Sequence, residues 1–291
     1  MKLGFFGMPQ GVSNYREGVD ACVANGLEYI ELYNGWEFDG RLMLPELIRN
    51  ARRWKEYADS RGIRVSCFSA YADVVGENRA AVIQQLKNLA EVCEVLGCPY
   101  LHHTLAPSME SANTAAGEVF EKAIGAVREI YDYAEAHGVK CLYEPQGLVF
   151  NGCQAIQRFL SEVGRDVGLV ADFGNPLFVG ESAKAFVTRF AHRIAHVHIK
   201  DYLVKESSAA DPGKYWYQAK NGDYLRDTII GHGHVPIRSL FRILLEAGYT
   251  GAYSLECGGL EHAHPEASAL DIENTKRFYQ EALQEVQAGL I

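Results

Sequence analysis

The amino-acid sequence predicts an α/β protein, a single (β/α)8 barrel that spans residues 1–291. Short β-rich runs alternate with helical patterns along the whole chain, as successive βα units do. Glycines follow several of the helical patterns, where a left-handed cap is favoured. No linker-like tract rich in Pro, Ser or Gly interrupts the alternation. The competing fold is a doubly wound open sheet, but no Gly-rich phosphate loop follows the first predicted strand.

The predicted strands are short runs rich in aliphatic, β-branched and aromatic residues. Taken in order, they lie at 3–6, 28–33, 63–69, 99–106, 139–144, 167–172, 194–200 and 252–256. Helices are expected at 45–60, 78–96 and 114–136, and the glycines that follow helical turns are Gly26, Gly62, Gly97 and Gly138. Eight repeats of helix, glycine and apolar strand are the number that closes a barrel.

Composition and charge limit the class of partner. The chain has 48% hydrophobic and 22% charged residues and a formal net charge of −9. Nucleic-acid and anionic membrane partners are not expected, because both require a concentrated basic face. No apolar run of about 18 residues and no signal-peptide layout is present, so a cytoplasmic protein with a small-molecule partner is expected. The seven cysteines are odd in number and form no C-x-x-C pair, so most are expected to be small buried residues.

The carboxyl ends of the predicted strands carry the residues of chemical interest, because barrel active sites lie at that face. The polar residues there are Glu31, Ser69, His102, His103, Glu144, Asp172, His198 and Glu256. The last four end the four consecutive strands 5 to 8. Any one carboxylate there could cap a helix or line the solvated rim, but three carboxylates and a histidine in phase on consecutive strands favour a metal site. Oxygen donors with one imidazole suit Mn²⁺, Mg²⁺, Co²⁺ or Zn²⁺.

The stretch HVHIKD, residues 196–201, ends the seventh predicted strand. Side chains alternate along a strand, so His196, His198 and Lys200 share one face. His196 lies deeper and is expected to pack or to support a ligand, whereas His198 is the expected ligand. Lys200 is a candidate contact to a substrate oxygen, and Asp201 is expected to cap or orient a neighbour.

These motifs together resemble the xylose-isomerase-like TIM-barrel superfamily of sugar phosphate isomerases and epimerases. They are YEP at Glu144, DFGN at Asp172, HVHIKD at His198 and SLE at Glu256, with GHGHVPIRSLFRILLEAGYTG before the last strand. The resemblance covers essentially the whole chain and is strongest over 139–256. It implies a divalent ion, often Mn²⁺, held by those four residues. It also implies that Glu144 and Glu256 are catalytic, one as base and one as acid on opposite sides of a bound sugar.

Two features depart from this family pattern. Asn175 stands three residues after Asp172, where many relatives have a histidine, and its amide can donate one neutral hydrogen bond instead. The step from His198 to Glu256 is also about one βα unit longer than expected. The surplus, 202–234, is expected to be an inserted loop over the catalytic face. Its Trp216 and Arg226 are candidate substrate contacts, although a subunit contact or a solvated loop would explain them too.

Two further candidates for substrate binding are Glu31 and His103. Glu31 is expected either to bind a hydroxyl or to line the polar end of the barrel. His102 and His103 are adjacent on strand 4, so one is expected to point inward and the other outward.

The predicted function is metal-dependent isomerisation or epimerisation of a ketose, keto-sugar or sugar phosphate, through an enediolate and two glutamates. A lyase or dehydratase acting on a keto-inositol or 3-keto-glycoside by the same carbanion chemistry is the alternative. An apurinic endonuclease would need additional histidines, and Ser69 and Asn175 occupy two of the places where they are expected. A non-catalytic sugar-binding protein is disfavoured by the complete set of four ligands. A homo-oligomer is expected.

Overall fold

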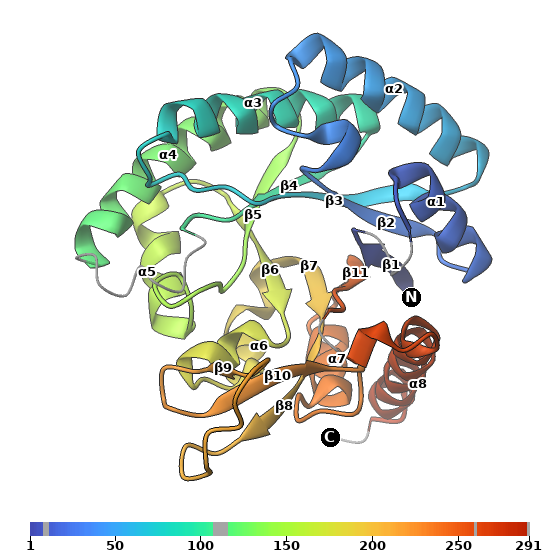
Figure 1. Cartoon of the computed structure of the whole chain (residues 1–291), viewed down its shortest axis with the longest axis vertical. Coiled ribbons are helices and arrows are strands. Elements are labelled where there is room, and N and C mark those ends of the chain that lie inside the picture. The colour runs from blue at the N-terminus through green and yellow to red at the C-terminus, as the bar shows by residue number, and fades with distance from the viewer. Residues whose placement is uncertain (8–11, 107–115, 259–260, 290–291) are drawn as a thin grey trace.

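The computed structural model describes residues 1–7, 12–106, 116–258 and 261–289 (Figure 1). Its parallel strands close into a barrel in the order β1-β11-β7-β6-β5-β4-β3-β2. These strands are β1 (Lys2–Phe6), β2 (Tyr29–Tyr33), β3 (Arg64–Ala70), β4 (Tyr100–His103), β5 (Lys140–Tyr143), β6 (Gly168–Asp172), β7 (Ile194–Ile199) and β11 (Ala252–Leu255). The predicted (β/α)8 barrel is therefore confirmed, and each predicted strand is present with its ends moved by at most three residues.

The helices lie outside this ring of strands (Figure 1). They are α1 (Tyr15–Ala24), α2 (Leu44–Ser60), α3 (Arg79–Leu96), α4 (Ala116–Ala136), α5 (Cys153–Val163), α6 (Ala183–Phe190), α7 (Ile237–Glu246) and α8 (Ala267–Gln287). Gly97 ends α3 in the left-handed region with φ of 68°, as its position after the predicted helix required. Residues 114 and 115 of the helix expected at 114–136 lie outside the described residues. Within the described residues, no helix combines the length and the apolar character needed to cross a bilayer.

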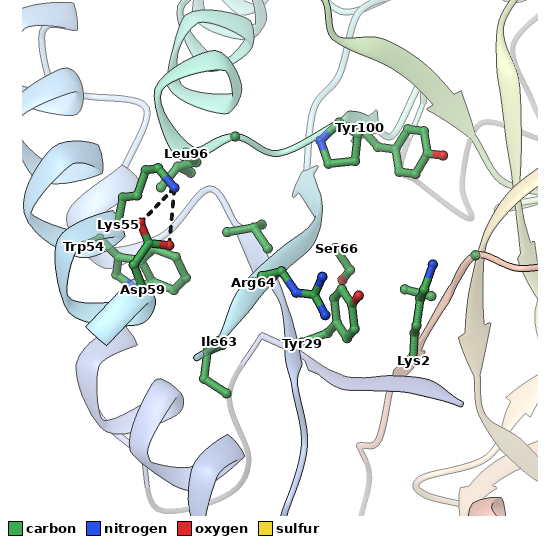
Figure 2. Close-up of a pocket in the computed structure, with 15 residues that line it drawn as sticks. Lys2, Tyr29, Trp54, Lys55, Asp59, Ile63, Arg64, Ser66, Leu96 and Tyr100 are labelled. Atoms are coloured by element: carbon green, nitrogen blue, oxygen red, sulfur yellow. Dashed lines mark hydrogen bonds and ion pairs between the residues drawn. The ribbon is translucent and has the colours of Figure 1, made fainter. Parts of the chain in front are cut away.

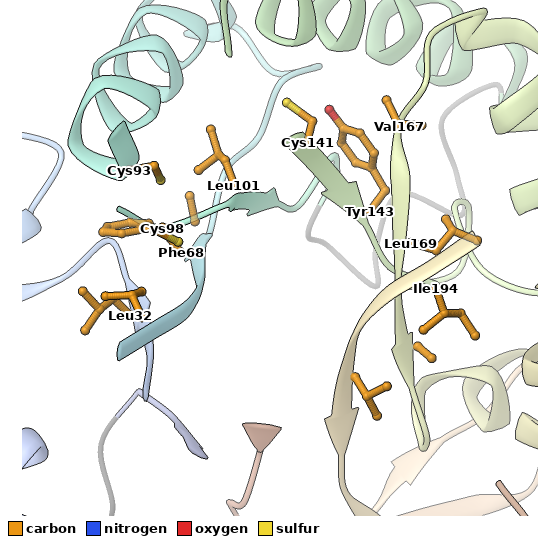
Figure 3. Packing of buried hydrophobic residues seen from close by; sticks show 14 of the residues in the cluster. Leu32, Phe68, Cys93, Cys98, Leu101, Cys141, Tyr143, Val167, Leu169 and Ile194 are labelled. Atoms are coloured by element: carbon orange, nitrogen blue, oxygen red, sulfur yellow. The ribbon is translucent and has the colours of Figure 1, made fainter. Parts of the chain in front are cut away.

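Outward-facing side chains of the strands form the main core with the helices. Figure 3 shows this layer, to which successive strands contribute Leu32, Phe68, Leu101, Tyr143, Leu169 and Ile194. Burying such large apolar side chains contributes about 1.5–3 kcal/mol each. The cysteines are free, and five of the seven are buried, as expected for small apolar residues.

The interior of the barrel changes from apolar to polar along the strand direction. Cys67, Leu142 and Val170 form a small buried cluster inside the ring. The next inward-facing positions, two residues later on each strand, are Ser69, Glu144 and Asp172, because side chains alternate between the two faces of a strand. The carboxyl end of the barrel therefore holds buried polar groups on an apolar floor.

The stretch 202–234, which was expected to be a loop, contains a small three-stranded antiparallel sheet joined by irregular segments. Its strands are β8 (Asp201–Lys205), β9 (Tyr217–Gln218) and β10 (Tyr224–Thr228), in the order β8-β10-β9. The Asp201 carboxylate accepts hydrogen bonds from the backbone N–H groups of Tyr202, Gly231, Gly233 and Val235. Asp201 thus ties the chain that leaves the sheet back to its first strand, the orienting role expected for it.

Gly4 is a position where the barrel tolerates no side chain. A Cβ at Gly4 would lie 2.4 Å from the backbone oxygen of Tyr29 on the neighbouring strand. We expect Gly4→Ala to lower the free energy of unfolding by about 3 kcal/mol, because β1 and β2 must separate. Gly125→Ala is the matched control: it lies within α4, the nearest atom to its Cβ is 4.0 Å away, and it should stabilise by about 0.5–1 kcal/mol. Urea denaturation measures both, and equal stability of the two variants would contradict the close strand contact.

Candidate active site

All four predicted metal ligands converge at the carboxyl end of the barrel. Asp172 ends β6, His198 lies on β7 beside it in register, and Glu144 and Glu256 directly follow β5 and β11. One ligand atom from each lies within 4.8 Å of the others. The Nδ1 atom of His198 is 3.1 Å from Glu256 Oε2, 3.2 Å from Glu144 Oε2 and 3.9 Å from Asp172 Oδ2. Three carboxylates therefore meet at a single imidazole nitrogen.

Glu31 fixes the orientation of this imidazole from below. Its carboxylate accepts hydrogen bonds from His198 Nε2 at 2.9 Å and His196 Nε2 at 2.7 Å. Burial alone would raise the pKa of Glu31, but the facing His198 and His196 outweigh it and hold that pKa well below its usual range. Glu31 is fully buried, so it lines the polar end of the barrel and supports the ring of His198, a predicted ligand. His196 lies on the same inward face.

Lys200 supplies a buried positive charge beside the ligands. Its ammonium is 2.9 Å from Asp172 Oδ2 and 2.8 Å from Glu256 Oε1. Burial raises the pKa of Asp172 to about 7 although Lys200 lies against it. Burial alone would also raise the pKa of Glu256, but Lys200 and His198 outweigh it and lower that pKa below its usual range.

A cavity of about 410 Å³ opens beside this cluster, and Glu256 is the predicted ligand that lines it. It is lined by Phe6, Gln146, Gly147, Asn175, Phe178, Lys200, Tyr202, Tyr217, Asp227, Glu256, Cys257 and Gly258. Its volume suits a small ligand such as a monosaccharide. Tyr202 and Tyr217 come from the sheet of β8, β9 and β10 and contact Phe178 edge-on or tilted, so that sheet forms one wall of the cavity.

The other candidate substrate contacts lie in different places. Asn175 and Lys200 line the cavity. Arg226 stacks over Trp216, with 5.2 Å from its Cζ atom to the ring centroid, and neither residue is among those that line the cavity. Arg226 and Asp227 are adjacent on β10, so their side chains point to opposite faces of that strand, and Asp227 is the one that lines the cavity.

The two adjacent histidines of β4 separate as expected, but His102 is the one that faces the site. Its Nε2 atom is 3.7 Å from Glu144 Oε1, and its Nδ1 atom is 2.9 Å from Ser69 Oγ. His103 points the other way and hydrogen-bonds to the Tyr143 hydroxyl at 2.9 Å. The sequence places both histidines at the barrel end, but the prediction of His103 as the candidate substrate contact is wrong in orientation; Tyr202 and Asp227 were not singled out. Ser69 and His102 are partners in register on β3 and β4, and recognising this pairing would have identified His102 as the histidine that faces inward.

A second cavity, of about 430 Å³, lies at the opposite end of the barrel (Figure 2). It is lined by residues at or near the amino ends of strands, such as Lys2, Arg64 and Tyr100. The acidic residue in its lining, Asp59, pairs with Lys55 at 3.0 Å. Barrel enzymes place their chemistry at the carboxyl ends of the strands, so the cavity with the carboxylate cluster is the candidate active site.

Comparison with known proteins identifies the family. An inosose isomerase from Halalkalibacterium halodurans is 24% identical over 84% of this chain and 83% of its own. An inosose dehydratase from Serratia proteamaculans is 26% identical over 68% of this chain and 70% of its own. The crystal structure of an IolI protein with a bound zinc atom superposes with a TM-score of 0.74, at 22% identity, over 98% of this chain and 99% of that one.

These two relatives are named as an isomerase and a dehydratase, and this chain is an enzyme of the superfamily that it shares with them. Its residues 19–278 match the family described as xylose isomerase-like TIM barrel. With the barrel closed as the sequence predicted and nearly the whole chain matched, the protein belongs to the xylose isomerase-like TIM barrel family.

Proposed function

We propose that this enzyme removes a proton from the carbon beside the carbonyl of a neutral keto-sugar or keto-inositol and returns it, as an isomerase or epimerase. The observation that carries the proposal is the convergence of Glu144 and Glu256 on His198 Nδ1, at 3.2 and 3.1 Å. Two carboxylates that meet at one point, one of them on the wall of a cavity, are what proton removal and proton return require.

A divalent ion fits the four residues Glu144, Asp172, His198 and Glu256. Their ligand atoms lie within 4.8 Å of one another, and burial, with the carboxylates of Glu256 and Glu144 adding to it, raises the pKa of Asp172. A cation would offset both effects. Oxygen donors with one imidazole accept Mn²⁺, Mg²⁺, Co²⁺ or Zn²⁺; we favour Mn²⁺, and the related IolI structure holds zinc. When bound, the ion would draw charge from the substrate carbonyl and so acidify the neighbouring C–H.

The chain's own side chains would move the proton. Glu256 is the better placed base, because it lines the cavity and Lys200 at 2.8 Å keeps it ionised. Glu144 approaches from β5 and is the candidate acid, with His102 Nε2 3.7 Å from its carboxylate. Return of the proton to the opposite face of the same carbon gives an epimer, whereas return to the adjacent carbon gives an isomer.

The cavity favours a neutral substrate over a phosphorylated one. Among the described residues that line it, Lys200 is the only cation, and Lys200 already contacts Asp172 and Glu256. Asp227 adds a further carboxylate to the wall, which would repel a phosphate. Phe6, Phe178, Tyr202 and Tyr217 offer flat apolar surface for the C–H face of a ring, and Gln146 and Asn175 offer amides for its hydroxyls.

Dehydration is the second candidate, and the position of Lys200 favours it. Its ammonium lines the same cavity and lies 2.8 Å from Glu256. Glu256 could take the proton from one carbon while Lys200 gives a proton to the hydroxyl leaving the next carbon, so that water departs and a C=C bond forms. The dehydratase relative from Serratia proteamaculans acts, by its name, on an inosose.

Deuterium exchange tests both candidates. The metal-loaded enzyme is incubated in D₂O with keto-inositols, 3-keto-glycosides, ketoses and ketose phosphates, and exchange at carbon is followed by NMR. Incorporation of deuterium with formation of an epimer or isomer supports the first candidate, and loss of water supports the second. We expect no exchange with ketose phosphates or after chelation of the metal. An absence of exchange with every neutral ketone would overturn the proposal.

A further inference from the structure

A second cluster of potential ligands lies on the wall of the cavity. Cys257 follows Glu256 at the end of β11, His262 belongs to the short helix η5 (Glu261–Ala263), and Asp271 lies on α8. One ligand atom from each of the three lies within 4.8 Å of the others. The cluster shares no residue with the four ligands of the candidate active site, although Cys257 lines the same cavity.

The His262 ring and the Asp271 carboxylate are held in place by the backbone. His262 Nδ1 hydrogen-bonds to the carbonyl oxygen of Gly258, which leaves Nε2 to face Asp271 Oδ2 at 3.0 Å. The other carboxylate oxygen, Asp271 Oδ1, accepts from the backbone N–H of Ile230 at 2.8 Å. A histidine whose Nδ1–H donates to a backbone carbonyl presents its Nε2 lone pair, the arrangement that metal-ligating histidines use. A lone pair and a carboxylate oxygen that face each other need a proton or a cation between them.

Access and charge also suit a cation. Asp271 is buried, whereas Cys257 is exposed, so an ion can reach the cluster from the solvent side. A second carboxylate is near, since a Cβ built at Gly258 would lie 4.0 Å from Asp227 Oδ2.

We propose that Cys257, His262 and Asp271 form a second metal site, separate from the catalytic one, that binds Zn²⁺. A thiolate with an imidazole and a carboxylate selects Zn²⁺ over Mg²⁺ or Mn²⁺. The Cys257 thiol releases its proton when the ion binds. Three protein ligands leave a fourth tetrahedral position for water or a substrate oxygen. Because Cys257 directly follows Glu256, an ion at this site also anchors the segment that carries that glutamate.

Cobalt spectroscopy isolates this site from the catalytic one. Metal-stripped protein is titrated with Co²⁺, and a thiolate-to-cobalt charge-transfer band is sought in the near ultraviolet. The catalytic ligands include no thiolate, and a band that is lost in Cys257→Ser reports the second site rather than the group of Glu31, Cys67 and His196. We expect it in the wild type and in His198→Ala, and we expect its loss in Cys257→Ser and a severe decrease in His262→Ala. Cys153→Ser, a partly buried cysteine on α5, is the matched control and should keep the band.

Metal content gives an independent measurement. After loading with Zn²⁺ and desalting, the wild type should hold two ions per chain and Cys257→Ser one, with circular dichroism confirming that the variant is folded. Absence of the cobalt band from the wild type, or its persistence in Cys257→Ser, would overturn the second site. Neither result would affect the deuterium-exchange test of the proposed function, which depends on the other four ligands.

Discussion

Replacing Glu256 with glutamine should lower the rate of C–H exchange by about 10³-fold, within the range that a positioned acid or base contributes. The amide keeps the size of the side chain but cannot accept a proton from carbon. Lys200 retains its contact with Asp172 at 2.9 Å, so the surrounding charges stay paired. We therefore expect the loss in kcat, with a smaller change in KM. Single-turnover exchange in D₂O, followed by NMR, measures it.

A matched substitution separates this chemical effect from a change in surface charge. Glu266→Gln alters an exposed glutamate just before α8 and should leave the exchange rate unchanged. Because Glu256 is also a proposed ligand, metal content is measured alongside, and the exchange rate is compared at saturating metal. If Glu256→Gln with a full complement of metal exchanges at the wild-type rate, Glu256 is not the base.

The convergence of the four proposed ligands could be predicted because their spacing along the sequence indicates their positions in a barrel. Each lies at the end of a strand, the first three recur at intervals of one βα unit, and a closed barrel brings the ends of neighbouring strands together. Asp172 and His198 are partners in register on β6 and β7, which their spacing already indicated. Glu31 was predicted either to bind a substrate hydroxyl or to line the polar barrel end, and its contact with His198 Nε2 required only that both side chains point inward.

The cavity wall could not be predicted in the same way, because it depends on how one piece of chain folds over another. Trp216 and Arg226 have suitable chemistry, but they contact each other, whereas Tyr217 and Asp227, the residues next to them, line the cavity. A shift of one residue along a strand moves a side chain to the other face. The same one-residue difference separates His102, which faces Glu144, from His103. Adjacent residues of similar type cannot be told apart until the register of the strand is known.

Replacing His198 with alanine should remove the divalent ion and abolish turnover. The ring supplies the only nitrogen among the four proposed ligands, and without it three carboxylates face one another with only Lys200 beside two of them. We expect a loss of metal affinity greater than the about 10–100-fold that removal of a supporting partner costs. Calorimetric titration with Mn²⁺ measures the affinity. His192→Ala, at an exposed histidine in the turn before β7, is the control and should bind the ion as the wild type does.

The supporting residue beneath His198 makes this prediction discriminating. Glu31 hydrogen-bonds to His198 Nε2 and so directs Nδ1 toward the carboxylates. We therefore expect Glu31→Gln to lower the affinity for the metal ion by about 10–100-fold while leaving all four ligands present. A graded series, with wild type tightest, Glu31→Gln intermediate and His198→Ala weakest, is the expected order if Nδ1 is the ligand atom. If Glu31→Gln binds as weakly as His198→Ala, the carboxylate beneath the ring is itself a ligand. If both variants bind the ion normally, His198 lies outside the metal site, and the imidazole serves only to pair the buried carboxylates.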